Sequence, residues 1–307
     1  MAIPYNKPSL SIPEQIALLE QRGLKIEDPA ETAHFLENVG YYRLAGYWQI
    51  FQSDPTTHTF NHGATFKQII ELYNFDRELR LLILDAIERI EVSFRSRMIN
   101  EMCKHHDPLW FTRYNLFFNH DTLDGIMDIV DKELARADED FLTHHRRTYN
   151  NEEYPPCWKT LQVLSFGTLS QLFGNIKNET VGKKEIALSY GLASPDFLHS
   201  WMQSISVLRN LCAHHSRVCY RVFSYPPKLL HRPRLAWVSR HLMPSSTGPL
   251  IQMLFLQLCS VKYLLHTVSP GNNFSTRLME LMIKYPSIEP NRMGFPPGWE
   301  NEPLWID

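Results

Sequence analysis

The pattern of hydrophobic and polar positions is helical along most of the chain. Over residues 66–103, apolar residues recur at spacings of three and four with no intervening proline or glycine, which predicts one helix about 55 Å long. Capping signals open two shorter helices, over residues 11–22 and 29–39. No apolar–polar alternation of the strand type exceeds four residues. The pattern therefore predicts an all-α protein, a helical bundle with an N-terminal helical extension.

The second half of the sequence continues in the same way. Trp201, Ile205 and Leu208 share one apolar face of an amphipathic helix that is expected to run through Tyr220. The other segments with helical periodicity are residues 121–145, 158–173, 181–190, 249–268 and 274–284.

Domain boundaries follow from composition. Residues 53–65 are polar and rich in turn formers, so they mark the main candidate boundary. We expect a helical extension over residues 1–60, the bundle over residues 61–285, and a proline-rich C-terminal tail over residues 286–307 that is draped over the surface.

Composition narrows the class of protein. Apolar residues make up 44% of the chain and aromatic residues 12%, enough for a sizeable core. No apolar run approaches the roughly 18 residues of a membrane span, and the N-terminus lacks the features of a signal peptide. A cytoplasmic protein that does not enter the membrane is expected. The cysteines form no Cys-x-x-Cys pair, so neither a disulfide framework, a metal site nor another cofactor is indicated: Cys103, Cys157, Cys212, Cys219 and Cys259.

Charge is distributed unevenly, although the net charge is only −2. Between Asp196 and Glu280 there is no acidic residue. Such asymmetry is typical of a surface that binds a polyanion. The alternative is that carboxylates from elsewhere in the fold pair with these cations. The interval holds nine basic residues: Arg209, Arg217, Arg221, Lys228, Arg232, Arg234, Arg240, Lys262 and Arg277.

A polar cluster follows the apolar helix face. Arg209, Asn210 and His214 form an Arg-Asn-x3-His pattern. A bare Arg-x4-His pair is expected about 0.9 times by chance in a chain of this composition, and the added Asn lowers that expectation to about 0.05. The pattern indicates a functional site, against the alternative of a solvated helix end.

The residue types suit cleavage of RNA without a metal. His214 can exchange a proton with a ribose 2′-hydroxyl or a departing 5′-oxygen. The planar fork of Arg209 matches a phosphate and the charge that develops on it, and Asn210 can orient His214 or a phosphate oxygen. The expected product is a 2′,3′-cyclic phosphate, and DNA should resist cleavage because it lacks the internal nucleophile.

One copy of the motif supplies one imidazole, whereas acid and base catalysis favour two. His215 lies about 100° round the expected helix, and Arg234 with His241 matches the motif only loosely. A homodimer that unites two copies would resolve the shortage. The candidate RNA-binding residues around the motif are His215, Arg217, Arg221, Lys228, Arg232 and Arg234.

Four stretches in order resemble the Abi-like proteins, the AbiD and AbiF type of bacterial abortive-infection protein. They are SIPEQIALLEQRGL, YYRLAGYW, TFKQIIELYNFDRELRLLILDAIERIEVSFR and LRNLCAHHSRV. That family resembles the HEPN superfamily, so the resemblance implies a HEPN-like helical bundle with a composite ribonuclease site across a dimer. It implies catalytic roles for Arg209 and His214 and an auxiliary role for Asn210. The chain departs from the family pattern at Cys219 and Tyr220, where an aromatic residue and an Asn are usual.

The resemblance also implies a supporting role for three residues of the long helix, Glu88, Glu91 and Arg95. The leading hypothesis is a phage-defence endoribonuclease or toxin that an antitoxin or another regulatory partner restrains. The first alternative is a non-catalytic protein that holds a structured small non-coding RNA. The second is a helical module whose basic third binds an acidic protein.

Overall fold

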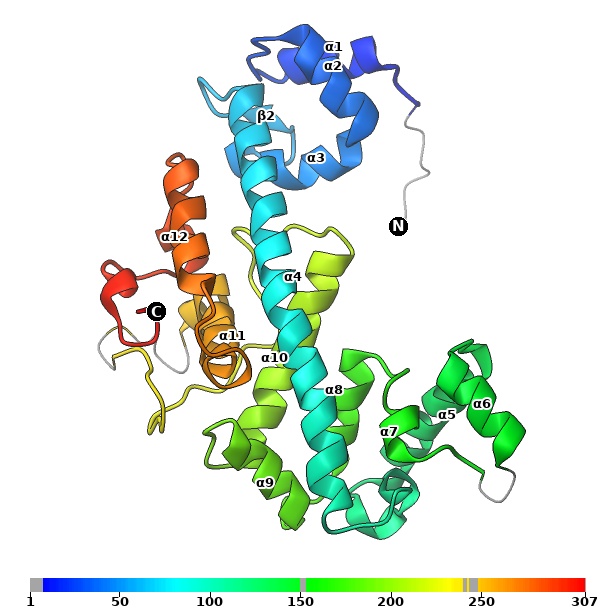
Figure 1. Ribbon diagram of the computed structural model, residues 1–307. Helices are drawn as coiled ribbons and strands as arrows, with labels where there is room; N and C mark the ends of the chain where they lie inside the picture. The colour runs from blue at the N-terminus through cyan, green and yellow to red at the C-terminus, as the bar shows by residue number, and fades with distance from the viewer. Residues whose placement is uncertain (1–7, 150–152, 240–241, 243–247, 307) are drawn as a thin grey trace. The chain divides into compact units, whose positions relative to one another are not determined.

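The computed structural model describes residues 8–149, 153–239, 242 and 248–306 (Figure 1). Helices dominate them, so the all-α prediction is confirmed. The strands assigned in the described chain are β1 (Gln52–Asp54) and β2 (Thr59–Phe60), which form an antiparallel hairpin. These strands are too short to produce a detectable alternation in the sequence.

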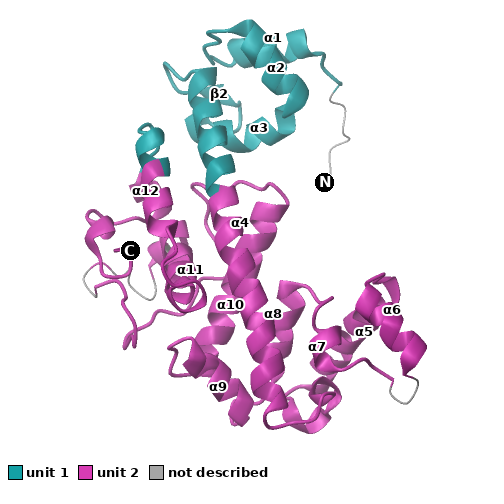
Figure 2. Cartoon of the chain, in the orientation of Figure 1, with its two compact units in different colours: residues 1–79, 281–289 teal, residues 80–280, 290–307 magenta. Residues whose placement is uncertain are grey.

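The chain divides into two compact units (Figure 2). Unit 1 comprises Met1–Leu79 and Leu281–Glu289, and unit 2 comprises Arg80–Glu280 and Pro290–Asp307. Both units receive residues from the long helix α4 (Phe66–Cys103). Its bounds are those the periodicity predicts.

Unit 1 is built from short capped helices. Among the described residues, its helices besides the first part of α4 and the last residues of α12 are α1 (Ile12–Gln21), α2 (Pro29–Asn38), α3 (Tyr41–Trp48) and the 3-10 turn η1 (Gln49–Phe51). Ser11 and Glu14 form the predicted capping box of α1. The Asp28 carboxylate accepts hydrogen bonds from the first turn of α2. In the core, the Tyr47 hydroxyl donates to buried Asp76 at 2.8 Å.

In unit 2, helices gather around the second part of α4 (Figure 1). Phe94 of α4 packs against Phe166 and Phe173 of α8, with ring centroids 6.2 and 5.3 Å away. Helix α10 contacts α8, α9 and α11. The helices of this unit are α5 (His120–Arg136), α6 (Asp140–Thr148), α7 (Cys157–Thr160), α8 (Phe166–Asn175), α9 (Val181–Ser189), α10 (Pro195–Ala213), α11 (Leu254–Val268) and most of α12 (Phe274–Lys284), with 3-10 turns η2 (Trp110–Thr112), η3 (Tyr114–Leu116), η5 (Pro249–Gln252), η6 (Pro290–Met293) and η7 (Trp299–Asn301).

Three predicted helices are broken in the structure. The helix expected over 121–145 is divided into α5 and α6 where Ala137 becomes extended. The helix expected over 158–173 is divided into α7 and α8, because the Ser165 side chain caps a new helix by accepting from the Thr168 amide. The first turns of the helix expected over 249–268 are 3-10, and extended Met253 separates them from α11. Such short interruptions leave the periodicity intact, which is why the periodicity does not reveal them.

The expectation that the C-terminal tail is draped over the surface is wrong for its aromatic part. Phe295, Trp299 and Trp305 are buried around Phe255 of α11. Large rings remove much apolar area from water when they cluster, which outweighs the irregular backbone that the prolines impose. In the described chain, no helix is both long and apolar enough to cross a membrane.

Candidate functional site

Helix α10 ends inside the polar cluster. The helix stops at Ala213, so the expected continuation to Tyr220 is wrong. The Ser216 amide donates to the Leu211 carbonyl at 2.8 Å, and the His215 amide donates to Cys212 at 3.1 Å. This is a Schellman motif, in which two backbone amides close the helix. The side chains beyond it are therefore not needed to satisfy those two carbonyls.

His215 occupies a left-handed position in that motif, with φ of 58°. Glycine is usual at this position, and a residue with a Cβ atom adopts it at a cost of roughly 1 kcal/mol. Tyr220 is also left-handed, with φ of 54°. Asn adopts this conformation more readily than most residues, so the backbone accounts for the Asn that the resemblance leads one to expect at Tyr220. Here the Arg292 guanidinium lies over the Tyr220 ring, 4.5 Å from its centroid.

A carboxylate from α4 holds the candidate catalytic arginine. One oxygen of Glu91 lies 3.5 Å from Nε of Arg209, and the other accepts from Arg95 at 3.1 Å. The Glu91 side chain is only 15% exposed, whereas that of Arg209 is 39% exposed. The Arg209 Nη1 atom also donates to Asn210 Oδ1 at 3.4 Å. The structure thus brings Glu91, Arg95, Arg209 and Asn210 together.

Arg95 connects this cluster to the loop between α7 and α8. Its guanidinium donates to the carbonyl of Leu161 at 2.9 Å and to that of Leu164 at 3.1 Å. The Arg95 side chain is 13% exposed, and its charge is met by Glu91. Arg95 therefore acts as a fixed support, and Arg209 is the more accessible of the two guanidinium groups.

His214 lies one turn beyond Asn210. Its amide donates to the Asn210 carbonyl at 2.9 Å, so the two residues follow one another on one side of the helix, and both are exposed. Glu88 is exposed on α4 and makes no ion pair within the described residues. Within the described residues, no ion pair joins Glu88 to Arg95 or Arg209, both of which pair with Glu91.

The basic segment after α10 turns back along that helix. The indole of Trp201 donates to the Lys228 carbonyl at 2.8 Å, and the Lys228 amide donates to Ser200 at 3.0 Å. Trp237 stacks on Trp201, with centroids 5.4 Å apart. Lys228 thus lies beside the helix about 14 Å before Arg209, at 1.5 Å per residue. We refer to residues 221–238 as the basic strap.

The strap carries cations without carboxylate partners. Arg221, Lys228, Arg232 and Arg234 are exposed, and none makes an ion pair within the described part of the chain. The alternative of pairing with distant carboxylates holds for other members of the basic interval. Arg209 pairs with Glu91, and Arg277 pairs with Asp85 at 3.1 Å.

The remaining basic residues of the interval differ from one another. Lys262 is buried, with Nζ donating to Asn272 at 3.4 Å, so it adds nothing to the surface. Arg217 is partly buried, and its Nη1 atom has no hydrogen-bond partner within the described chain. Arg240 and His241 lie outside the described residues.

The chemistry available to the cluster comes from side chains alone. It combines a positioned guanidinium, an amide and an exposed imidazole, beside a strap of exposed cations. Within the described residues, no group of three or more His, Cys, Asp or Glu side chains could hold a metal ion. Two features of the site could not be predicted from the sequence: the Leu161 and Leu164 carbonyls that bind Arg95, and the Trp201 indole that binds the Lys228 carbonyl. No sequence pattern indicates which carbonyl or indole will form a hydrogen bond with a distant segment.

Comparison with known proteins gives a family match. A family model described as Abi-like protein matches residues 34–220, more than half of the chain. The matched range includes all of α4 and α10 and the whole Arg209–His214 cluster. No curated protein matches the chain. No solved structure matches it either.

Proposed function

Since the chain belongs to the family of Abi-like proteins, an abortive-infection family, we propose that it defends bacteria against phage by cleaving RNA without a metal. The observation that carries this proposal is the Arg209 guanidinium, held by Glu91 from α4, next to Asn210 and one turn from the exposed His214. A carboxylate that fixes one edge of a guanidinium leaves its other N–H groups available to a phosphate.

The proposed reaction uses the substrate's own hydroxyl. An imidazole removes the proton of the ribose 2′-hydroxyl, and the 2′-oxygen attacks the adjacent phosphorus. The bond to the 5′-oxygen breaks, and that oxygen receives a proton from an imidazolium. The products are a 2′,3′-cyclic phosphate and a free 5′-hydroxyl. Arg209 stabilises the extra negative charge on the phosphorane oxygens, and Asn210 orients Arg209 or the phosphate.

Two imidazoles would come from two copies of the chain. We propose a homodimer in which the exposed faces of α4 and α10 meet, so that His214 of each protomer serves one composite site. Val92, next to Glu91, is 52% exposed on this face of α4. Light scattering should give twice the monomer mass. A monomer that nevertheless cleaves RNA would contradict the composite site.

Cleavage is tested with labelled RNA in EDTA. The wild-type protein should release cyclic-phosphate ends, and a substrate with a 2′-deoxy sugar at the cleaved position should be inert. Arg209→Ala and His214→Ala should each slow formation of the product by at least about 10²-fold while keeping the helical circular dichroism of the wild type. Cleavage that EDTA stops, or that both variants retain, would contradict the mechanism.

RNA binding is tested separately, because the strap supplies cations independently of catalysis. We expect affinity to fall steeply with salt, since each phosphate contact releases counterions. Neutralising one of Lys228, Arg232 or Arg234 should reduce the slope of log K against log salt by about 0.7 for a single strand. Loss of affinity without a change in slope would contradict direct phosphate contacts.

A second candidate function is the holding of a structured small non-coding RNA without cleavage. The four strap cations, which form no ion pair within the described chain, favour it as much as they favour an enzyme. Tight binding of co-purified RNA, with no cyclic-phosphate product from wild type or variants, would select this alternative. In that case an antitoxin need not be invoked, because the bound RNA is itself the regulatory partner.

A further inference from the structure

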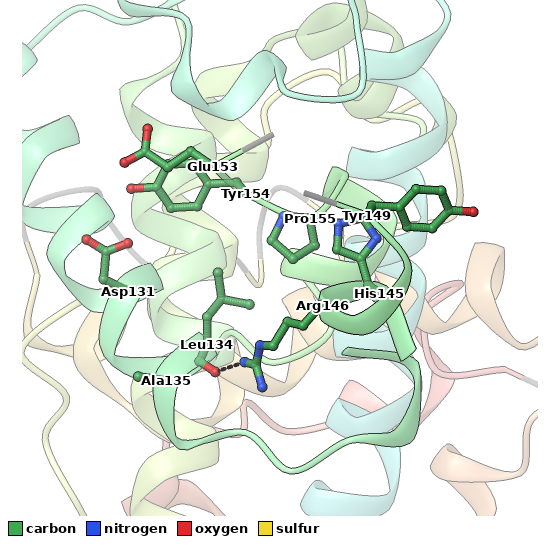
Figure 3. A pocket seen from close by; sticks show the side chains of 9 residues that line it. All are labelled: Asp131, Leu134, Ala135, His145, Arg146, Tyr149, Glu153, Tyr154 and Pro155. Carbon is green, nitrogen blue, oxygen red and sulfur yellow. Dashed lines mark hydrogen bonds between the residues drawn. The ribbon is translucent and has the colours of Figure 1, made fainter. Parts of the chain in front are cut away.

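A hollow with aromatic and cationic walls lies in unit 2, lined by other residues than Arg209 and His214. It has a volume of about 460 Å³, and its lining includes Arg113, His145, Tyr149, Tyr154, Trp158 and Lys159. Small-molecule sites typically fall between roughly 300 and 1,000 Å³. A second hollow of about 530 Å³ shares His145, Tyr149 and Tyr154 with the first (Figure 3).

The aromatic rings of this hollow are unusually accessible. Trp158 is 46% exposed at α7, and Tyr149 is 54% exposed after α6. Trp110 and Phe111 of η2, in contrast, are buried. Exposed rings that line a hollow offer flat faces on which a nucleobase can stack, and such stacking tolerates any base.

Two cationic side chains, Lys159 and Arg113, also line this hollow. Lys159 follows Trp158 directly, and its Nζ atom has one long hydrogen bond of 3.4 Å, to the Phe141 carbonyl. Partial burial, and to a smaller extent the Lys159 charge, lower the pKa of His145. Arg113 is 52% exposed and shares its charge with Asp107 at 3.0 Å. A phosphate in this hollow would meet the Lys159 ammonium, which forms no ion pair within the described residues, and the Arg113 guanidinium, which Asp107 partly neutralises.

Carboxylates line both hollows: Asp107 in the first, and Asp131 and Glu153 in the adjoining one. Asp131 and Glu153 lie on the Tyr154 side of it, while His145 and Tyr149 lie on the other (Figure 3). Burial, together with a hydrogen bond donated to Asp131, raises the pKa of the Tyr154 hydroxyl to about 12. Carboxylate oxygens accept from the amino groups of bases and from ribose hydroxyls. The two hollows together therefore present stacking faces, a phosphate partner and acceptors.

We propose that this α6–α7 hollow binds one unpaired nucleotide, with the base stacked on Trp158 or Tyr149 and the phosphate held by Lys159 and Arg113. The proposal rests on the proposed function where the nucleotide belongs to the RNA that the protein binds. A free nucleotide has the same chemistry, and the experiment separates the two sources.

The hollow is also connected to the Arg209 cluster by short contacts. Trp158 and Lys159 immediately precede the loop whose Leu161 carbonyl accepts from Arg95, and Arg95 shares Glu91 with Arg209. A nucleotide on α7 would thus bind to an element that Arg95 ties to the catalytic arginine. We therefore expect an RNA strand to contact both the Arg209 cluster, where it is cleaved, and this hollow, which binds a nucleotide remote from the cleaved bond.

The test measures binding of an unstructured RNA oligonucleotide and of adenosine and uridine monophosphates to the full-length protein. Trp158→Leu keeps an apolar side chain but removes the aromatic face, Trp158→Phe restores it, and Lys159→Gln removes the cation. We expect roughly tenfold weaker RNA binding for Trp158→Leu, near wild-type binding for Trp158→Phe, and a smaller loss for Lys159→Gln. Ultraviolet cross-linking should attach RNA to the peptide that contains Trp158.

Matched controls are Tyr42→Ala, an aromatic residue 85% exposed in unit 1, and Lys132→Gln on the exposed face of α5. Neither should change affinity. If wild type binds RNA but Trp158→Leu binds equally well and cross-links map elsewhere, the hollow is not a nucleotide site, and the proposed function is untouched. If wild type binds the monophosphates but no RNA, and Trp158→Leu loses them, the hollow takes a free nucleotide and the proposed function fails. Absence of both kinds of binding overturns both proposals.

Discussion

Two helix ends in unit 2 show opposite ways of satisfying backbone carbonyls. At the end of α8, the buried ammonium of Lys183 donates to the carbonyls of Gly174 and Ile176 and to Asn178 Oδ1. At the end of α10, backbone amides of His215 and Ser216 perform that role. The end of α8 thus requires a buried charged side chain. The end of α10 does not, and His214 and His215 are exposed there. The carbonyls that Lys183 satisfies therefore account for its position at α8. At α10 the backbone amides close the helix, so the exposed His214 side chain is not required for capping.

Arg209→Ala should show the largest effect of any change at the α10 end. Removing the guanidinium takes away the main stabiliser of the phosphorane charge, and loss of one such donor costs about 10²–10³ in rate. Single-turnover cleavage of RNA measures it. The matched control is Arg277→Ala, which removes a guanidinium of similar exposure, 43%, from another carboxylate pair. Equal losses of cleavage rate in both variants would mean that Arg209 contributes only to the overall positive charge of the protein and does not stabilise the transition state directly.

Lys183→Met should produce the largest loss of stability, at the α8 end. The variant leaves buried carbonyls without a donor, which costs about 1–3 kcal/mol. Urea unfolding at pH 7 measures the change in the free energy of unfolding. Retained stability would show that water can replace the ammonium.

The pH dependence of stability bears on the same contrast. Burial lowers the pKa of Lys183 to about 8 from its ordinary value of 10.5. Between these values the unfolded chain binds more protons than the folded protein, so the Lys183 contribution to the free energy of unfolding should rise with pH from about 8 to 10.5. Lys183→Met should lack that rise in urea unfolding at the same pH values. If the free energy of unfolding had the same slope against pH in both proteins, this would contradict a lowered pKa of Lys183.

Glu91→Gln should have an intermediate effect on activity. The amide keeps the shape of the carboxylate but no longer fixes Arg209 by charge, so we expect roughly tenfold slower cleavage, the size of a positioning effect. RNA affinity should change little, because the strap cations are unaltered. Glu88→Gln, on the same helix but outside the cluster, is the control. An equal loss in the control would point to the overall charge of α4.

His215→Gly should give the smallest effect on stability, because it relieves backbone strain and removes a side chain at the same time. Glycine adopts the left-handed position without strain, which contributes up to about 1 kcal/mol to the free energy of unfolding, and this gain is offset by the loss of the interaction that His215 makes in the folded protein. Urea unfolding measures the net change. RNA binding should weaken at the same time if the His215 imidazole contacts the phosphate backbone. A variant more than about 1 kcal/mol less stable than wild type would contradict a strained left-handed backbone at His215.

Much of the fold follows from local patterns in the sequence. The bounds of α4 and α12 are those that periodicity predicts, and the caps of α1 and α2 are recognisable from Ser11 and Asp28. The interruptions at Ala137 and Ser165 are not, because two short helices and one long one share the same apolar period. The buried aromatic tail escapes prediction for a related reason, since prolines indicate irregular backbone and do not indicate where it packs.

The residue types of the candidate site, Arg209, Asn210 and His214, and the basic interval around them can be read from the order of amino acids alone. Which of the charges are neutralised depends on tertiary packing. Glu91 and Arg209 are more than one hundred residues apart and meet because α4 and α10 pack together. Lys228 and Lys262 are indistinguishable cations in the sequence, yet one is exposed on the strap and the other is buried. Helical periodicity is a local property of the chain, whereas the pairing of charges depends on which surfaces the folded helices bring into contact.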